Sequence, residues 1–297
     1  MQTTVQHSPS QFNVPAYFAL AATIAAISWS AIFVRWADVP GPVSAFYRVL
    51  IAAAVLVPWR LVRGATRQPQ SRRAVWTAVA GGVFFALDLA LWNTAVMTTQ
   101  AAVASILGNN TPIFVALMSW MAFRKRPRAP FWIGLALSMA GCLLILGARV
   151  QDGALIRSSL AGNLLALGAS FFFAAYLVAT ERVRATMDTL TFNTLAILGS
   201  VAALLVICIA VDMPLGGITP RGWLALAGLG LVTQLAAYYL LVYALGHLPA
   251  TITSVGLLAQ VPCTAMLAWL FLGEPLAASQ IVGGAVVLAG IYVVNRQ

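Results

Sequence analysis

The chain has 297 residues, of which 61% are hydrophobic and only 8% are charged, and its formal net charge is +10. Soluble domains carry roughly 25% charged residues, so this composition cannot build a water-exposed shell. A soluble globular protein and a disordered chain are both excluded. The basic excess lies in short stretches between long apolar runs, a placement typical of membrane topology rather than of nucleic-acid binding.

Apolar runs long enough to cross a bilayer follow one another along the whole chain. About 20 apolar residues span the hydrocarbon core as a helix, and by this measure the sequence predicts an all-α membrane protein with ten transmembrane helices. We expect them at residues 15–36, 42–60, 74–97, 100–123, 130–147, 160–180, 190–211, 222–245, 249–272 and 278–295. Their connections are short, so we expect nearly all of the chain to lie within the lipid bilayer.

The basic residues predict the orientation of these helices. Five lie between residues 60 and 73 and four between 124 and 128, in connections on the side where ten spans also place both termini. Because Lys and Arg are enriched in cytoplasmic loops, we predict cytoplasmic N and C termini. The expected location is the bacterial inner membrane.

The second half of the sequence repeats features of the first at an offset of 149 residues. Trp120 falls on Trp269, Gly134 on Gly283, and Gly141 on Gly290. The offset maps the fourth and fifth predicted spans onto the ninth and tenth, which predicts repeats at residues 1–149 and 150–297. Each repeat has five helices, an odd number, so the second enters the membrane inverted. Inverted repeats with a substrate site near the midplane are typical of secondary transporters.

The stretch from Pro249 to Val294 resembles the closing signature of EamA-type members of the drug/metabolite transporter superfamily. The first half is similar to the family pattern at Trp29 and Phe33, at the Pro40/Pro42 turn before Arg48, and at Ser105 upstream of Pro112. The resemblance covers essentially the whole chain. Arg124-Lys125 departs from it, because the family usually has Gly-Glu there.

This resemblance implies ten helices with both termini inside and the export of small metabolites. Amino-acid exporters, including the aromatic amino-acid exporter group, belong to the family. We therefore expect a secondary transporter that exports small metabolites, with amino acids including aromatic ones as the preferred class. A multidrug or other metabolite exporter of the same fold is the alternative, and an integral membrane enzyme is a second.

Five polar side chains are predicted at similar depth near the middle of the membrane. Counting 1.5 Å per residue from the span ends places Asp88, Asn109 and Asn110 about 14–15 Å deep. Gln234 and Gln260 reach about 17 Å from the other side. Polar groups in lipid are costly, so these five are expected to face an interior cavity and to bind substrate.

Asp88 is the only acidic residue near the centre of a predicted span. It is expected to contact a substrate ammonium group or to carry a proton, since intramembrane ionisable groups suggest function. The alternative is a structural pair with Arg48, whose long side chain reaches inward from the second span.

Aromatic residues are further candidates for the substrate site. Trp92 follows Asp88 by four residues and shares its helix face, and Trp29 lies deep in the first span. Each of these tryptophans is expected either to line a cavity or to pack in the core. In the eighth span Tyr239 and Tyr243 share one face while Gln234 and Tyr238 share another, and periodicity does not choose which looks inward. Tyr176 is a weaker candidate that could instead extend to the membrane surface.

Two prolines within predicted spans are candidates for structural or gating roles. Pro112 lies on one face with Ser105 and Asn109 and removes a backbone hydrogen bond, which kinks a helix. Pro262 has a comparable place in the ninth span, displaced by one position from the repeat offset. Membrane helices also tolerate proline without any gating function.

Several motifs are missing from the sequence. There is no phosphate-binding loop and no metal-binding histidine motif, so we expect no cofactor, no metal, no catalytic residues and no ATPase subunit. The isolated cysteines are expected to pack in apolar surroundings. The predicted partners are a small-molecule substrate and the bilayer, with no nucleic acid.

Overall fold

The computed structural model describes residues 13–64, 70–98, 101–124, 127–147, 159–273 and 277–296. All regular elements within these ranges are helices. Ten helical segments of the described chain are long and apolar enough to cross a membrane, which confirms the predicted all-α class and the number of spans. Their ends differ from the predicted ends by a few residues. The protein is an integral, multi-pass membrane protein.

The first five spans contain seven helices, because the first and the fourth spans are each interrupted. These helices are α1 (Val14–Ser28), α2 (Ser30–Ala37), α3 (Gly41–Arg63), α4 (Arg72–Thr98), α5 (Ala101–Gly108), α6 (Thr111–Phe123) and α7 (Ala129–Gly147). The first span breaks at Trp29 and the fourth at Asn109 and Asn110.

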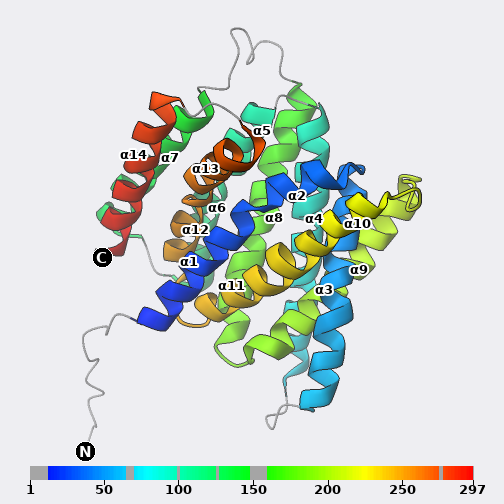
Figure 1. Cartoon of the computed structure of the whole chain (residues 1–297). Helices are drawn as coiled ribbons and strands as arrows, with labels where there is room; N and C mark the ends of the chain where they lie inside the picture. The colour runs from blue at the N-terminus through cyan, green and yellow to red at the C-terminus, as the bar shows by residue number, and fades with distance from the viewer. Residues whose placement is uncertain are drawn as a thin grey trace, which may run out of the picture.

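The last five spans contain an interrupted and a π-helical span. Their elements are α8 (Leu160–Arg184), α9 (Thr189–Ala210), α10 (Pro220–Gly228), the π-helix η1 (Leu229–Ala236), α11 (Ala237–Leu245), α12 (Ala250–Leu257), α13 (Gln260–Leu272) and α14 (Ala278–Asn295). The eighth span runs through α10, η1 and α11, and the ninth breaks at Leu258 and Ala259. Both α1 and α12 begin at the end of the bundle where α14 ends (Figure 1).

Side chains at the helix starts satisfy backbone N–H groups that have no partner inside the helix. Asp188 accepts from the N–H of Thr191 at 3.0 Å at the start of α9. Thr219 accepts from Gly222 at 3.0 Å before α10, and Ser159 accepts from Gly162 at 3.3 Å before α8. These caps fix where the spans begin at the membrane surface.

The interruptions of the fourth and ninth spans lie at positions that correspond by the repeat offset. α5 and α12 both have 8 residues, and α6 and α13 both have 13. In each pair the helix of the second half starts 149 residues after its equivalent in the first half. The residues that end α6 and α13 also correspond, since Arg124 has φ 55° and Gly273 has φ 68°. The two halves are therefore structural repeats, and the predicted boundary between residues 149 and 150 lies outside the described residues.

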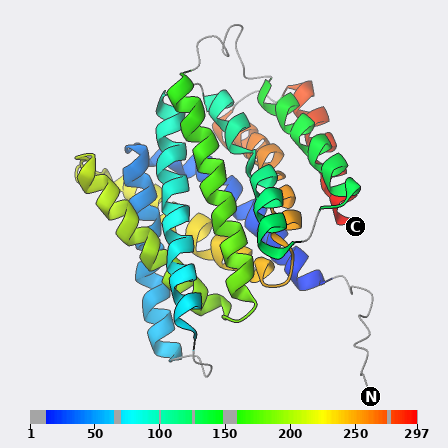
Figure 2. The ribbon, with the colours of Figure 1, turned by 180° about the vertical axis from the view of Figure 1, so that it is seen from behind.

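α7 and α14 form an antiparallel pair at one side of the bundle (Figures 1 and 2). A Cβ atom at Gly134 would lie 2.5 Å from the carbonyl oxygen of Gly290, and one at Gly141 would lie 2.6 Å from that of Gly283. Only glycine permits this approach. The repeat offset exchanges the two glycine contacts, as expected for inverted halves related by a pseudo-twofold axis.

On the other side of the bundle α4 packs on α8 and α9, and also contacts α3 and α5. Gly82 on α4 lies against the carbonyl of Ala196 on α9, and Ser200 donates a 2.7 Å hydrogen bond to the Gly82 carbonyl oxygen. This close approach brings α3, α4, α8 and α9 together with η1 and α11. The largest hydrophobic cluster lies among these helices.

Candidate functional site

Two opposite charges lie in the interior of the bundle. Arg48 on α3 is 7% exposed, while Asp88 is half-buried on α4, a helix that contacts α3. Arg48 Nε has no hydrogen-bond partner within the described residues. A buried, unpartnered guanidinium N–H is costly, so this donor is available to an acceptor from a ligand or water.

Tyr238 on α11 completes this charged centre. The Arg48 Cζ lies 5.8 Å from the centre of the Tyr238 ring, within the range of a cation–π interaction. Tyr238 is 7% exposed, and its ring centre lies 4.6 Å from that of Phe85 on α4. The second and third spans of the first half thus meet the eighth span at one place.

A small cavity of about 20 Å³ adjoins Tyr238, large enough for roughly one water molecule. Its polar wall consists of Tyr176, Asn193, Ser200, Gln234 and Tyr238. Gln234 is 5% exposed, and its side-chain carbonyl has no hydrogen-bond partner among the described residues. The cavity therefore combines aromatic rings with polar groups that are not fully satisfied.

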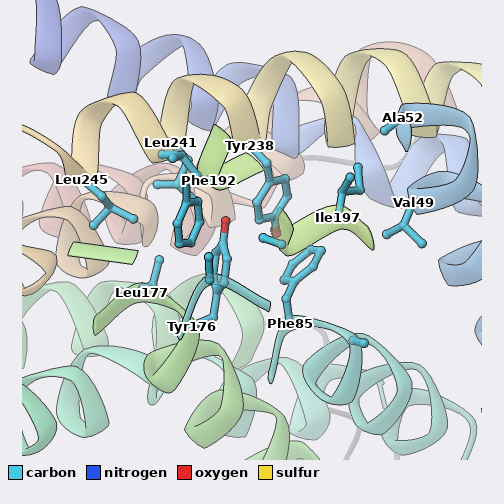
Figure 3. Packing of buried hydrophobic residues seen from close by; sticks show 14 of the residues in the cluster. Val49, Ala52, Phe85, Tyr176, Leu177, Phe192, Ile197, Tyr238, Leu241 and Leu245 are labelled. Atoms are coloured by element: carbon cyan, nitrogen blue, oxygen red, sulfur yellow. The ribbon is translucent and has the colours of Figure 1, made fainter. Parts of the chain in front are cut away.

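Aromatic rings from three helices form the rest of this centre, as Figure 3 shows. Tyr176 on α8 lies 5.2 Å from Phe85 and 6.4 Å from Phe192 on α9, measured between ring centres. Tyr176 is 3% exposed and does not extend to the membrane surface. We name Arg48, Asp88, Phe85, Tyr176, Gln234 and Tyr238 the polar–aromatic centre.

The π-helix positions Gln234 and Tyr238. A single π-helical segment changes the phase of the helix face, and such segments are frequent at functional sites. Gly230 in η1 permits the approach to α3, because a Cβ there would lie 2.6 Å from Ile51 Cβ. The Gln234/Tyr238 face therefore looks into the bundle.

The structure places Tyr239 and Tyr243 away from this centre. Tyr239 packs on Trp59, with ring centres 5.5 Å apart, and Tyr243 packs on His247 at 4.5 Å. Both lie toward the end of the bundle where α11 ends. Of the two faces that periodicity left open, the Gln234/Tyr238 face is the one that joins the centre, so Tyr238 is the tyrosine of this helix that lies there.

Trp92, Asn109 and Asn110 lie together at the break of the fourth span. Trp92 packs over Gly108, where a Cβ atom would lie 3.3 Å from the indole Cδ1. Asn109 Nδ2 donates to the Ser105 carbonyl at 2.8 Å, and Asn110 Nδ2 donates to that of Leu107 at 2.9 Å. The amides thus satisfy carbonyl groups at the end of α5. Pro112 occupies the first turn of α6, where a missing N–H costs little.

Trp29 and Gln260 belong to a different seam, between the first and ninth spans. Trp29 lies 4.7 Å from Phe271, between ring centres, and Ser28 donates to the Gln260 carbonyl oxygen at 3.5 Å. Pro262 faces α14 instead, 3.2 Å from the position of a Cβ atom on Gly284. The breaks of the first and ninth spans therefore touch each other.

A surface hollow of about 380 Å³ lies between α2 and α10 and is lined by Phe33, Trp36, Arg221, Leu224 and Ala225. No group of three His, Cys, Asp or Glu residues that could hold a metal occurs within the described ranges. The polar–aromatic centre is the place where buried charge, unsatisfied polar groups and both halves of the chain coincide.

Comparison with known proteins agrees with this architecture. The chain is 30% identical over 254 residues to the uncharacterized transporter YwfM of Bacillus subtilis (strain 168), covering 84% of this chain and 82% of that protein. It is 29% identical over 229 residues to the pseudopaline exporter CntI of Pseudomonas aeruginosa, covering 76% and 77%. A crystal structure with 21% sequence identity has the same fold, with a TM-score of 0.80 over 95% of this chain and 98% of that one.

Both halves of the sequence match one family separately. The description "EamA-like transporter family" applies to residues 15–147 and again to residues 160–296, which correspond to the two structural repeats. The chain belongs to the EamA-like transporter family.

Proposed function

We propose that this transporter exports small zwitterionic metabolites, with amino acids including aromatic ones as the preferred class. The observation that carries the proposal is the buried Arg48 Nε, which has no partner within the described residues, together with Asp88 on the neighbouring helix α4. Arg48 offers donors to a substrate carboxylate, and Asp88 attracts a substrate ammonium group. A zwitterion satisfies both charges at once, whereas a simple cation or anion satisfies one.

The aromatic residues favour a substrate with an apolar or aromatic side chain. Phe85, Tyr176 and Tyr238 form contiguous rings next to Arg48, and such rings stack on aromatic substrates or contact apolar ones. Trp92 and Asn109 extend the same side of the bundle toward the break of the fourth span. In this proposal these side chains select the substrate, while Arg48 and Asp88 orient it.

Transport is proposed to proceed by alternating access between the two inverted halves, residues 1–149 and 150–297. In inverted-repeat transporters the substrate site lies where the repeats meet, often beside discontinuous helices. The breaks of the first, fourth and ninth spans and the π-helix are the points at which such motion is accommodated. The direction of transport is proposed by analogy with the relative named as a pseudopaline exporter.

The orientation follows from the positive-inside rule. α3 ends with Arg60 and Arg63, and α4 begins with Arg72 and Arg73, so basic residues gather at one end of the bundle. We place that end in the cytoplasm, together with both termini, in a bacterial inner membrane. A membrane-impermeant label on a tag at either terminus tests this placement.

Counterflow in proteoliposomes tests the substrate class. Labelled phenylalanine, leucine, lysine and glutamate are offered with and without a pH gradient, and exchange of at least one neutral amino acid is expected. Asp88→Asn and Arg48→Gln are expected to lower this exchange at least tenfold at normal protein level. Asp212→Asn and Arg182→Gln, which change charges at exposed positions, serve as matched controls.

The alternative, a multidrug exporter, gives a different pattern in the same assay. A lipophilic cation needs Asp88 and has no use for the guanidinium of Arg48. Exchange of cations but of no amino acid, lost in Asp88→Asn and retained in Arg48→Gln, contradicts the proposed substrate class and supports the alternative.

A further inference from the structure

Arg184, the last residue of α8, is bound to the end of α11. Its Nε donates to the Val242 carbonyl oxygen at 3.2 Å, and its Nη1 donates to the carbonyl of Met187. The guanidinium also lies over Gly246, where a Cβ atom would be 2.6 Å from Nη2. A positive charge at a helix C-terminus is stabilised by the helix dipole, so Arg184 binds the end of α11 by charge and by hydrogen bond.

Glu181 makes the complementary contact one turn earlier on α8. Its Oε2 accepts a 3.1 Å hydrogen bond from the backbone N–H of Ala250, the first residue of α12. A negative charge at a helix N-terminus is also stabilised by the dipole. Residues three apart share a helix face. Two opposite charges of α8 therefore hold the end of α11 and the start of α12, which meet at the turn of one helical hairpin.

These contacts lie at the C-terminal end of α8, and Tyr176, the residue of α8 in the polar–aromatic centre, is nearer to this end of the helix than to its start. Tyr176 precedes Arg184 by eight residues, which is about 12 Å along a helix. The helices that the contacts join, α8 and α11, also supply Tyr176 and Tyr238 to the cavity. Separation of α8 from the α11–α12 hairpin is therefore one way to open a path from this end to the cavity.

The repeat offset supplies a second, independent observation. Arg184 corresponds to Arg35, which lies in the last turn of α2, and inversion places that turn toward the other end of the bundle. The surroundings of the two residues differ, because α8 packs on both α11 and α12, whereas the packing of α2 is mainly on α10. Arg184 is half-buried and Arg35 is exposed. The two halves are thus in different arrangements at equivalent positions.

We propose that Glu181 and Arg184 form a latch that closes the α11–α12 end of the transporter and that is released once in each transport cycle. Arg35 is the equivalent residue for the opposite end. Glu181 and Arg184 are positioning residues, since they act through the α8–hairpin contact and touch no substrate. The proposal rests on alternating access and not on the proposed substrate class.

Thiol labelling without substrate tests the latch. Ser200 lines the cavity, so Ser200→Cys is introduced after Cys142, Cys208 and Cys263 are replaced. A membrane-impermeant methanethiosulfonate is added to one face or the other of oriented proteoliposomes. Arg184→Ala and Glu181→Ala are each expected to raise the labelling rate from the α11–α12 face about fivefold or more, with little change from the opposite face.

Two matched variants separate a latch from a general structural role. Arg182→Ala removes an exposed arginine two residues away and is expected to label like the parent protein, and Arg184→Lys to restore part of the closure. Arg35→Ala is expected to raise labelling from the opposite face instead. Equal increases from both faces, or unchanged labelling in Arg184→Ala and Glu181→Ala of folded, monodisperse protein, overturn the proposal. If Arg184→Ala does not fold, Glu181→Ala decides by the same criterion.

Discussion

Ser138 on α7 donates a 3.3 Å hydrogen bond to the carbonyl oxygen of Val287 on α14, and these two residues are 149 positions apart. Because 149 is also the repeat offset, each residue is the equivalent of the other in the opposite half. Equivalent residues can touch only where the pseudo-twofold axis passes. The Ser138–Val287 contact therefore locates the axis between α7 and α14 and explains why the glycine contacts on either side of it are exchanged by the repeat.

The glycine contacts predict where the α7–α14 pair tolerates no added atom. Gly141→Ala places a Cβ 2.6 Å from the Gly283 carbonyl oxygen, and such overpacking typically costs about 1–3 kcal/mol. We expect a lower midpoint of thermal unfolding in detergent. Gly147→Ala, on the same helix with nothing within 4 Å of the new Cβ, is the control and is expected to leave the midpoint unchanged. Equal midpoints for the two variants contradict this packing.

The ends of α6 and α13 predict a stabilising substitution. Arg124 has φ 55° where its equivalent Gly273 has φ 68°, and a left-handed conformation strains any residue that has a Cβ atom. Arg124→Gly is expected to stabilise the protein by about 0.5–1 kcal/mol, measured as a raised thermal midpoint. Arg128→Gly removes a nearby charge without relieving a positive φ and is expected to give no such gain. A lower midpoint in Arg124→Gly is the contrary result.

Asp188 predicts a pH-dependent contribution to stability. Partial burial opposes ionisation, but hydrogen bonds from Thr191 and the charge of Arg60 outweigh it and lower the pKa of Asp188 below its usual value. Because the pKa is lower in the folded state, this stabilisation is complete above the pKa of the unfolded chain and is lost as the pH falls through the folded pKa.

Asp188→Ala is therefore expected to destabilise the start of α9 at pH 7 by about 1 kcal/mol, as the loss of a helix cap does. The difference in thermal midpoint between Asp188→Ala and the parent protein should shrink as the pH is lowered below 4. Asp212→Asn, at an exposed position outside the spans, is expected to show no such trend. A difference that is constant with pH contradicts the role given to the carboxylate.

The fold could be predicted from the sequence because the lengths of the apolar runs and the repeat offset can both be read directly from the order of the residues. The ten spans and the correspondence of the fourth and ninth spans followed from them. Asn109 and Asn110 were expected near the membrane midplane and lie at a helix break. The break itself could not be predicted from the sequence, because the side-chain amides of these residues replace the lost helical hydrogen bonds only once α5 and α6 have formed.

The inward face of the eighth span could not be predicted, for a definite physical reason. Regular 3.6-residue periodicity leaves the Gln234/Tyr238 face and the Tyr239/Tyr243 face equivalent. The π-helix Leu229–Ala236 shifts the phase, and its position depends on the contact of Gly230 with α3. The sequence interpretation also placed Glu181 and Arg184 in a connection. In the structure α8 continues to Arg184, because hydropathy falls before a helix ends.

The two charges of the polar–aromatic centre predict how substrate analogues compete. If Arg48 binds a carboxylate and Asp88 an ammonium group, then an amino acid competes for counterflow at least tenfold better than its amine or its des-amino acid analogue. Arg48→Gln should weaken competition by the amino acid and leave competition by the amine unchanged. Asp88→Asn should weaken competition by the amino acid and by the amine, and leave competition by the des-amino acid unchanged.

Counterflow of labelled phenylalanine in proteoliposomes, with phenylalanine, phenethylamine and 3-phenylpropionate as competitors, tests the proposed roles of Arg48 and Asp88 most directly. We expect phenylalanine to be exchanged and to be the only one of the three that competes strongly. We also expect Arg48→Gln to abolish its advantage over phenethylamine, while Arg182→Gln preserves it. Exchange that is equally fast in the parent protein and in Arg48→Gln at equal protein level would contradict a role of Arg48 in substrate binding.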